Sequence, residues 1–225
     1  MVNLEPELQA LKENLLEMME LVTSQLAKCK KSLVKADPEL AKEVLAAEKR
    51  VNALELTIDK DCENILALYN PVATDLRFVL ASLKIGNDLE RIGDNANSLA
   101  KFLSSDLHKK ERQFVDKFNL EVMFDVAIDM LNDMGKAVKG KDTQLALKTL
   151  KKDVVLNEYG KKASKIAAAL IKEYPNKVRL ILRIFSITRR LERVGDLIKN
   201  LGEEVVFHVE AKVIKHKKEI ENKKG

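Results

Sequence analysis

Apolar residues recur every three or four positions along almost the whole chain, which is the spacing of one face of an α-helix. No stretch of useful length alternates apolar and polar residues, so the sequence predicts no β-strands. The pattern predicts six long helices, at about residues 4–36, 38–69, 71–103, 112–138, 142–173 and 175–218. Asp37-Pro38 and Asn70-Pro71 each combine an N-cap residue with a proline at the first helical position, and Gly140-Lys141-Asp142 separates the fourth and fifth helices.

Short connections between long helices imply that neighbouring helices run antiparallel. We therefore expect an all-α protein made of two antiparallel three-helix bundles that are related by internal duplication. Residues 1–104 would form the first bundle and residues 112–225 the second, joined by a short polar connection. The second bundle would finish in a basic helix end, residues 212–225.

One six-residue pattern carries the evidence for duplication. Leu89–Asp94 returns as Leu191–Asp196, 102 residues later. The carboxylates of each copy are four residues apart: Glu90 with Asp94, and Glu192 with Asp196. On a helix this spacing puts both carboxylates on one face, about 5–6 Å apart at Cβ, where like charges repel by a few tenths of a kcal/mol. A mildly destabilising pattern that occurs twice indicates that a cation binds there.

The two copies also share a glycine between the carboxylates. Gly93 and Gly195 would each cost about 1 kcal/mol relative to alanine in a helix interior. The repeated penalty predicts that another backbone approaches closely at both positions.

Further candidate ligands lie on the helices expected to pack against these motifs. The second helix carries a polar stripe with Glu48, Asn52, Glu55 and Asp59, the fifth helix carries Asp153 and Asn157, and Asn87 lies near the first motif. All of these offer oxygen atoms, which favour Mg²⁺, Mn²⁺ or iron over a soft structural Zn²⁺ site. Gly160 and Ser164 stand where Glu55 and Asp59 would recur, so the two sites would differ in charge. The ordinary alternative, acids on solvated helix faces, stays open.

Four arginines complete the set of candidate site residues. Arg91 and Arg193 point away from the carboxylate face at helical spacing, so we expect them to brace a neighbouring helix. Arg77 and Arg179 take corresponding places near the starts of the third and sixth helices, and we assign them structural or partner-binding roles.

Composition narrows the class of protein. The chain is 46% hydrophobic and 33% charged, with eight glycines and four prolines, as suits long helices around a core. It contains no run of about 18 apolar residues, the length of a membrane span, and its first residues lack the pattern of a secretory signal. Cys29 and Cys62 lack metal-type spacing, so we expect a reduced, cytoplasmic protein.

The net charge of +5 is concentrated in lysines near the end of the chain. A basic tail can touch nucleic acid or an anionic membrane surface. No aromatic residues alternate with these lysines to stack on bases, so we expect no nucleic-acid partner and at most peripheral contact with a membrane.

The order of these motifs resembles the PhoU family of phosphate-uptake regulators. The resemblance covers nearly the whole chain and rests on Glu48–Asn52, Asn70–Arg77, Asn87–Asp94, Asp153–Asn157, Arg179, Leu191–Asp196 and Asn200–Glu204. It implies two three-helix bundles, and metal ions or clusters bound through the Glu/Asp-x-x-x-Asp motifs. It also implies a non-enzymatic cytosolic accessory of the phosphate ABC transporter, commonly a homodimer, that contacts the transporter ATPase and a phosphate-sensing histidine kinase to restrain phosphate-starvation signalling.

The chain departs from the family pattern at a few positions. Asn95 and Leu197 follow the motif aspartates, where the family usually has His or Tyr, and Ser98 stands where an Asn is frequent. Asn52 and Asn157 replace an acid on the facing helices and lower the charge of the ligand sets.

Two other functions compete with a metal-binding regulator. A carboxylate-bridged di-iron oxidase would need Glu-x-x-His pairs on facing helices, but His108, His208 and His216 all lie outside the motifs. A structural helical adaptor without metal, whose acids pair with arginines, stays open. The sequence shows no nucleophile–base pair and no Gly-rich phosphate loop, so we expect no enzyme, and phosphate could bind only at a metal or through arginines.

Overall fold

The computed structural model describes residues 3–104 and 112–214, and every long element in these ranges is a helix. The elements in chain order are α1 (Glu5–Lys35), α2 (Pro38–Tyr69), α3 (Ala73–Leu103), α4 (Arg112–Lys117), α5 (Leu120–Gly140), α6 (Thr143–Leu150), α7 (Asp153–Glu173), the short 3₁₀ helix η2 (Pro175–Lys177) and α8 (Val178–Glu210). The predicted all-α class of packed helical bundles is confirmed.

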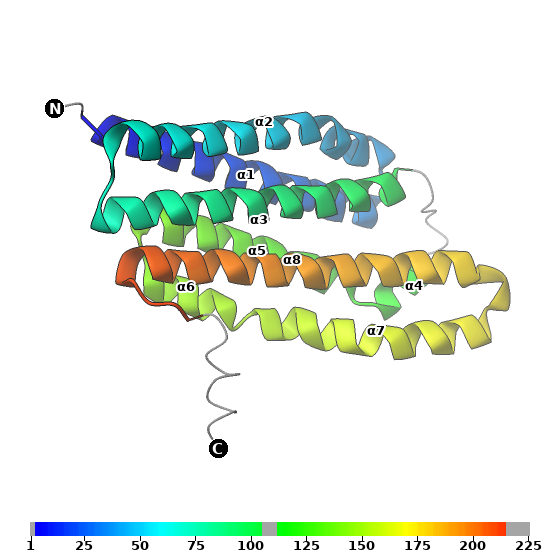
Figure 1. Ribbon diagram of the computed structural model, residues 1–225. Coiled ribbons are helices and arrows are strands. Elements are labelled where there is room, and N and C mark those ends of the chain that lie inside the picture. Colours follow the sequence, from blue (N-terminus) through cyan, green and yellow to red (C-terminus); the bar gives the residue numbers. More distant parts are fainter. Residues whose placement is uncertain (1–2, 105–111, 215–225) are drawn as a thin grey trace, which may run out of the picture.

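The helices lie lengthwise beside one another in an elongated molecule (Figure 1). α1, α2 and α3 pack on each other, and α5 to α8 form a second group with α8 at its centre. α3 and α8 run side by side between the groups, and α1 also packs on α5. The division of the chain into two domains stays a prediction from the sequence.

The first three helices follow the apolar pattern closely. Leu11, Leu15 and Ile58 are fully buried in a core that extends through both groups. The Asp37 side chain accepts a hydrogen bond from the Glu39 backbone N–H at 3.0 Å, which confirms the predicted N-cap of α2.

The prediction that Asn70-Pro71 opens the third helix is wrong. Asn70 ends α2 in a left-handed conformation with φ 46°, and α3 begins only at Ala73. Asparagine tolerates this conformation better than most residues, so the same residue type can end one helix or begin another.

Two of the helices predicted for the second group are interrupted. The helix expected over 112–138 breaks before Leu120, where Asn119 is left-handed with φ 53° and Phe118 is buried. The helix expected over 142–173 breaks after Leu150, where the Lys152 ammonium lies 2.7 Å from the Asp133 carboxylate of α5. Neither break contains glycine or proline. The first coincides with the burial of Phe118, and the second with the ion pair of Lys152 and Asp133.

The last helix ends at Glu210 rather than near residue 218. Ala211 is left-handed with φ 55°, and residues 211–214 are not helical, so the prediction of a helix end over 212–225 is wrong for its first three residues. Lys212 pairs with Glu210 at 2.8 Å, and residues 215–225 lie outside the described part of the chain. None of the described helices combines the length and the apolar character that a bilayer crossing would need.

The motif glycines lie where neighbouring helices approach. A Cβ atom on Gly93 would lie 3.0 Å from Val51 Cγ1, and one on Gly195 would lie 2.5 Å from Leu156 Cδ1 and 2.6 Å from Asp153 Oδ1. Close approach is therefore confirmed, but the groups that approach are side chains rather than the backbone. These two glycines allow α3 to lie close to α2, and α8 close to α7.

Alanine substitutions at Gly135 and Gly195 should change the free energy of unfolding in opposite directions, because the two glycines have different surroundings. Gly135 lies inside α5 with nothing within 4 Å of a Cβ position, so Gly135→Ala should raise the free energy of unfolding by about 0.5–1 kcal/mol through helix propensity. Gly195→Ala should lower it by about 1–3 kcal/mol because Leu156 and Asp153 must move. Urea denaturation of both variants measures the difference, and equal effects would contradict close packing at Gly195.

Candidate metal centres

The first candidate centre lies between α2 and α3. Burial raises the pKa of Glu90, and the charges of Asp94, Glu55 and Glu48 raise it further, while Arg91 opposes them. The carboxylates of both helices therefore act on one another across the space between the helices.

The pKa of Glu55, on the opposite helix α2, is raised in the same way as that of Glu90. Burial raises the pKa of Glu55 first, followed by the charges of Asp59 on its own helix and Asp94 on α3. Glu48, Glu55 and Glu90 are half-buried. Asp94, by contrast, is exposed, so only part of the acid set is withdrawn from water. The first centre is thus a row of acids along an interhelical groove that water reaches.

The second candidate centre, between α7 and α8, is more deeply buried at one residue. Asp153 is only 3% exposed, and its Oδ1 atom has no hydrogen-bond partner among the residues that the structure describes. Burial raises the pKa of Asp153, and Asp196 and Glu192 raise it further, while Lys199 and a hydrogen bond from Asn157 oppose them. Asn157 Nδ2 donates to Asp153 Oδ2 at 2.6 Å. An unpartnered buried carboxylate oxygen is suited to a cation.

Arg189 distinguishes the second centre from the first. Its guanidinium donates to the Glu192 carboxylate three residues later, in one turn of α8. The Glu192 oxygens lie against Gly160, where a side chain would overlap them, so the glycine that replaces Glu55 makes room for this carboxylate. An arginine three residues before a glutamate on a helix is a pattern from which this ion pair could have been predicted.

As the side chains stand, no three Asp, Glu, His or Cys residues in the described ranges converge closely enough to hold one ion. In both centres, acids on two helices lie within electrostatic range, with oxygen donors that suit Mg²⁺, Mn²⁺ or iron. The half-exposed carboxylates would have to rotate toward an ion.

The cysteines and His208 offer no ligands to these centres. Burial raises the pKa of Cys29 and of Cys62 to about 12, so both thiols are protonated at neutral pH. Burial lowers the pKa of His208 to about 4, and its ring packs 5.1 Å from that of Phe78 in the contact between α8 and α3. His108 and His216 lie outside the described residues.

The other predicted site residues take varied places. Arg77 Nε donates to the His208 carbonyl at 3.3 Å and so joins α3 to α8, in agreement with a structural role. Arg91 pairs with Asp88 of its own helix at 3.0 Å, so the expectation that it braces a neighbouring helix is wrong. Asn87, Arg179 and Arg193 are exposed.

Comparison with known proteins agrees with this architecture. The model of the PhoU domain family matches residues 15–103 and 120–205, which together include both acid motifs. The chain belongs to the PhoU family. The match was expected from the duplicated motifs and covers each copy separately.

Individual PhoU proteins resemble the chain along nearly their full length. It is 35% identical over 209 residues to phosphate-specific transport system accessory protein PhoU homolog 1 of Thermotoga maritima, covering 92% of this chain and 88% of the relative. The corresponding homolog of Aquifex aeolicus is 30% identical over 210 residues, and the match covers 93% of this chain and 94% of the relative. The crystal structure of PhoU from Pseudomonas aeruginosa superposes with a TM-score of 0.83 at 28% identity, covering 93% of this chain and all of that one. The crystal structure of the phosphate transport system regulatory protein PhoU from Streptococcus pneumoniae superposes with a TM-score of 0.80 at 26% identity. This match covers 94% of this chain and 99% of that one.

The raised pKa of Asp153 gives a pH-dependent prediction for the metal-free protein. As pH rises past the ordinary value of 3.8, the unfolded state ionises before the native state, so ionisation of Asp153 lowers the free energy of unfolding. Asp153→Asn should therefore be more stable than wild type at neutral pH, by on the order of 1 kcal/mol, and this gain should vanish as pH falls below 3.8.

Chemical denaturation in the presence of a chelator, at several pH values, measures this difference. The control Glu158→Gln changes an exposed acid of the same helix. Its free energy of unfolding should stay within about 0.5 kcal/mol of that of wild type at every pH. If Asp153→Asn were less stable than wild type at neutral pH, this would contradict the claim that the charge of Asp153 is uncompensated in the metal-free protein.

Proposed function

We propose that this protein is a cytoplasmic regulatory accessory of a phosphate-specific transport system. The observation that carries the proposal is similarity over about nine tenths of the chain to relatives described as accessory proteins of that system. The proposed role is negative regulation of phosphate transport and of phosphate-starvation signalling, through contacts with the transporter ATPase and a phosphate-sensing histidine kinase. We propose that it acts as a homodimer and not as an enzyme.

We further propose that the regulator binds divalent metal at its two acid centres. At the first centre, carboxylates on α2 and α3 would hold the ion: Glu48, Glu55, Glu90 and Asp94, with Asp59 nearby. At the second centre, Asp153, Glu192 and Asp196 would do so, with the Asn157 amide oxygen. Mutual repulsion and burial both raise carboxylate pKa values here, and a bound cation relieves both effects.

A structural adaptor without metal is the second candidate function. The ion pair of Arg189 with Glu192 favours it at the second centre, because a guanidinium there already compensates one of the acids. Within the described ranges, no ion pair engages Glu90 or Asp94 at the first centre, so the contacts there favour metal more strongly.

Metal binding is tested by titrating Mn²⁺ into chelator-treated protein by calorimetry. Glu90→Gln with Asp94→Asn removes two proposed ligands from the first centre and should weaken the strongest Mn²⁺ binding by about tenfold to a hundredfold. Glu13→Gln with Glu158→Gln removes the same charge from exposed helix positions and should leave the binding unchanged. Unchanged binding in the first variant, or no Mn²⁺ binding by wild type, would favour the metal-free adaptor.

The regulatory role is tested by co-purification with the ATPase of the phosphate ABC transporter from the same organism. We expect selective capture of this ATPase, with a different yield in the presence and absence of phosphate. The control is the ATPase of an unrelated ABC importer. Equal capture of the two ATPases would contradict the proposed partner.

A further inference from the structure

Two surface hollows meet on the first half of α8. One, of about 330 Å³, lies along α8, and its lining includes Glu192 and Asp196 of the second acid centre. The other, of about 270 Å³, lies between α8 and the last turns of α3. Both hollows are lined by Ser186 and Arg190.

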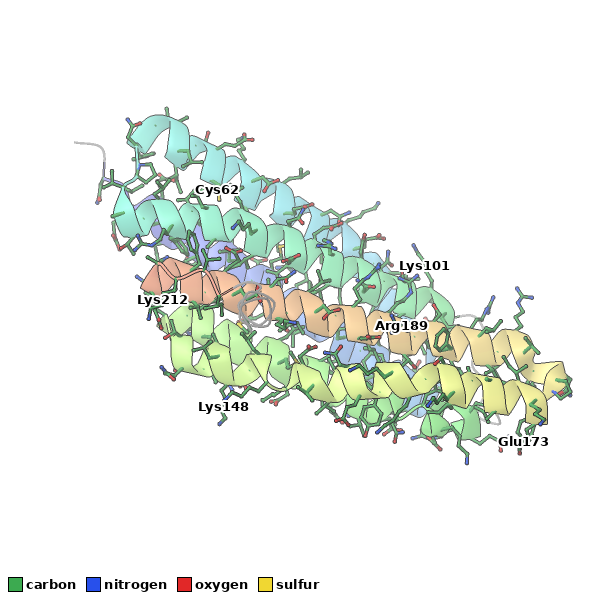
Figure 2. The ribbon with its side chains drawn as sticks, turned by 60° about the horizontal axis from the view of Figure 1, so that its bottom comes forward. Cys62, Lys101, Lys148, Glu173, Arg189 and Lys212 are labelled. Atoms are coloured by element: carbon green, nitrogen blue, oxygen red, sulfur yellow. The ribbon has the colours of Figure 1, made fainter. Side chains whose placement is uncertain are left out.

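We name the joint feature the Arg190 groove and define it by Ser98 and Lys101 of α3 with Arg183, Ser186, Arg190 and Arg193 of α8. Figure 2 shows Lys101 near the end of α3 and Arg189 on the neighbouring α8.

Helical spacing gathers the cationic side chains on this side of α8. Ser186, Arg190 and Arg193 are separated by four and three residues, so they lie along one face of the helix. Arg183 joins the same face one turn earlier and stacks over the Phe102 ring, with its guanidinium carbon 5.9 Å from the ring centroid. The groove is thus lined by fork-shaped donors with a serine between them.

The charge of the groove is only partly compensated. Of the two carboxylates that line the first hollow, Glu192 is paired with Arg189, and Asp196 is exposed to water. Arg190 is half-buried, and neither Arg190 nor Arg193 forms an ion pair or hydrogen bond with any residue in the described ranges. Withdrawing a guanidinium from water without an acceptor costs free energy, which a bound anion would recover.

The duplicated copy shows that this charge does not follow from the fold alone. A shift of 102 residues places Lys84 at the position of Ser186, and Asp88 at that of Arg190. There the cation is compensated, because Lys84 Nζ lies 3.1 Å from Glu204, and Asp88 pairs with Arg91 at 3.0 Å. Within the described residues, the second copy thus has an unpaired, half-buried arginine at a hollow, where the first copy has an ion-paired aspartate.

We propose that the Arg190 groove binds a tetrahedral phosphoryl dianion, either free phosphate or the phosphoryl group of a monoester. Guanidinium groups donate two parallel hydrogen bonds to such oxyanions, and the serine hydroxyls can donate further bonds. The volumes of the two hollows, about 330 and 270 Å³, lie near the lower bound of about 300 Å³ for ligand pockets, which suits a compact anion. The proposal goes beyond metal binding, since these donors are protein side chains.

The test measures binding of inorganic phosphate and of phenyl phosphate to chelator-treated protein by calorimetry. Wild type should bind at least one of the two, and the probe that binds identifies the source of the phosphoryl group. Arg190→Ala with Arg193→Ala should weaken binding by about tenfold or more, as expected for the loss of charge-assisted hydrogen bonds. Arg190→Lys should retain part of it, because it keeps the charge and loses the fork.

A matched control separates local contacts from net charge. Lys161→Ala with Lys165→Ala removes two positive charges from exposed positions of α7 outside the groove, and it should bind phosphate as wild type does. Equal weakening in both double variants overturns the site, as does the absence of phosphate and phenyl phosphate binding by wild type. Binding of a hexaglutamate peptide alone also overturns it, in favour of a carboxylate partner. Because chelator is present, none of these outcomes depends on the proposed metal centres.

Discussion

Apolar packing in this protein holds like charges together. Val51 and Leu156 fill the space beside Gly93 and Gly195, and the closeness that results brings acids of neighbouring helices into one groove. Burying one large aliphatic side chain contributes about 1.5–3 kcal/mol, which exceeds the few tenths of a kcal/mol by which a pair of exposed acids repels on a helix. The fold can therefore tolerate the acid grooves without a bound ion, and the raised pKa values of Glu55, Glu90 and Asp153 are the remaining sign of the cost.

The two copies of the duplicated unit have diverged around this shared constraint. The first copy keeps acids on both helices, whereas the second replaces one with Gly160 and compensates Glu192 with Arg189. On the next face of α8 the second copy carries Arg190 where the first has Asp88. The first copy is thus more acidic around its motif, whereas in the second copy cationic and acidic groups lie side by side.

The sequence predicted what depends on periodicity and missed what depends on contacts between distant residues. The apolar repeat placed α1, α2 and α3 to within a few residues, and the spacing of Glu90 and Asp94 placed both on one side of α3. The breaks at Asn119 and after Leu150 contain no glycine or proline to signal them, and they coincide with the burial of Phe118 and with the Lys152–Asp133 pair. The contact of Arg77 with the His208 carbonyl likewise joins residues far apart in the sequence, which no local pattern reveals.

The most direct measurement of the central claim is anomalous diffraction from crystals of the protein grown with saturating Mn²⁺. We expect an anomalous peak in the groove between α2 and α3, within coordination distance of Glu90 and of at least one acid of α2. The carboxylates there should be turned toward the ion relative to their present positions. Well-ordered carboxylates at this groove without an anomalous peak would contradict the claim that the acids of the first copy are held together for a cation.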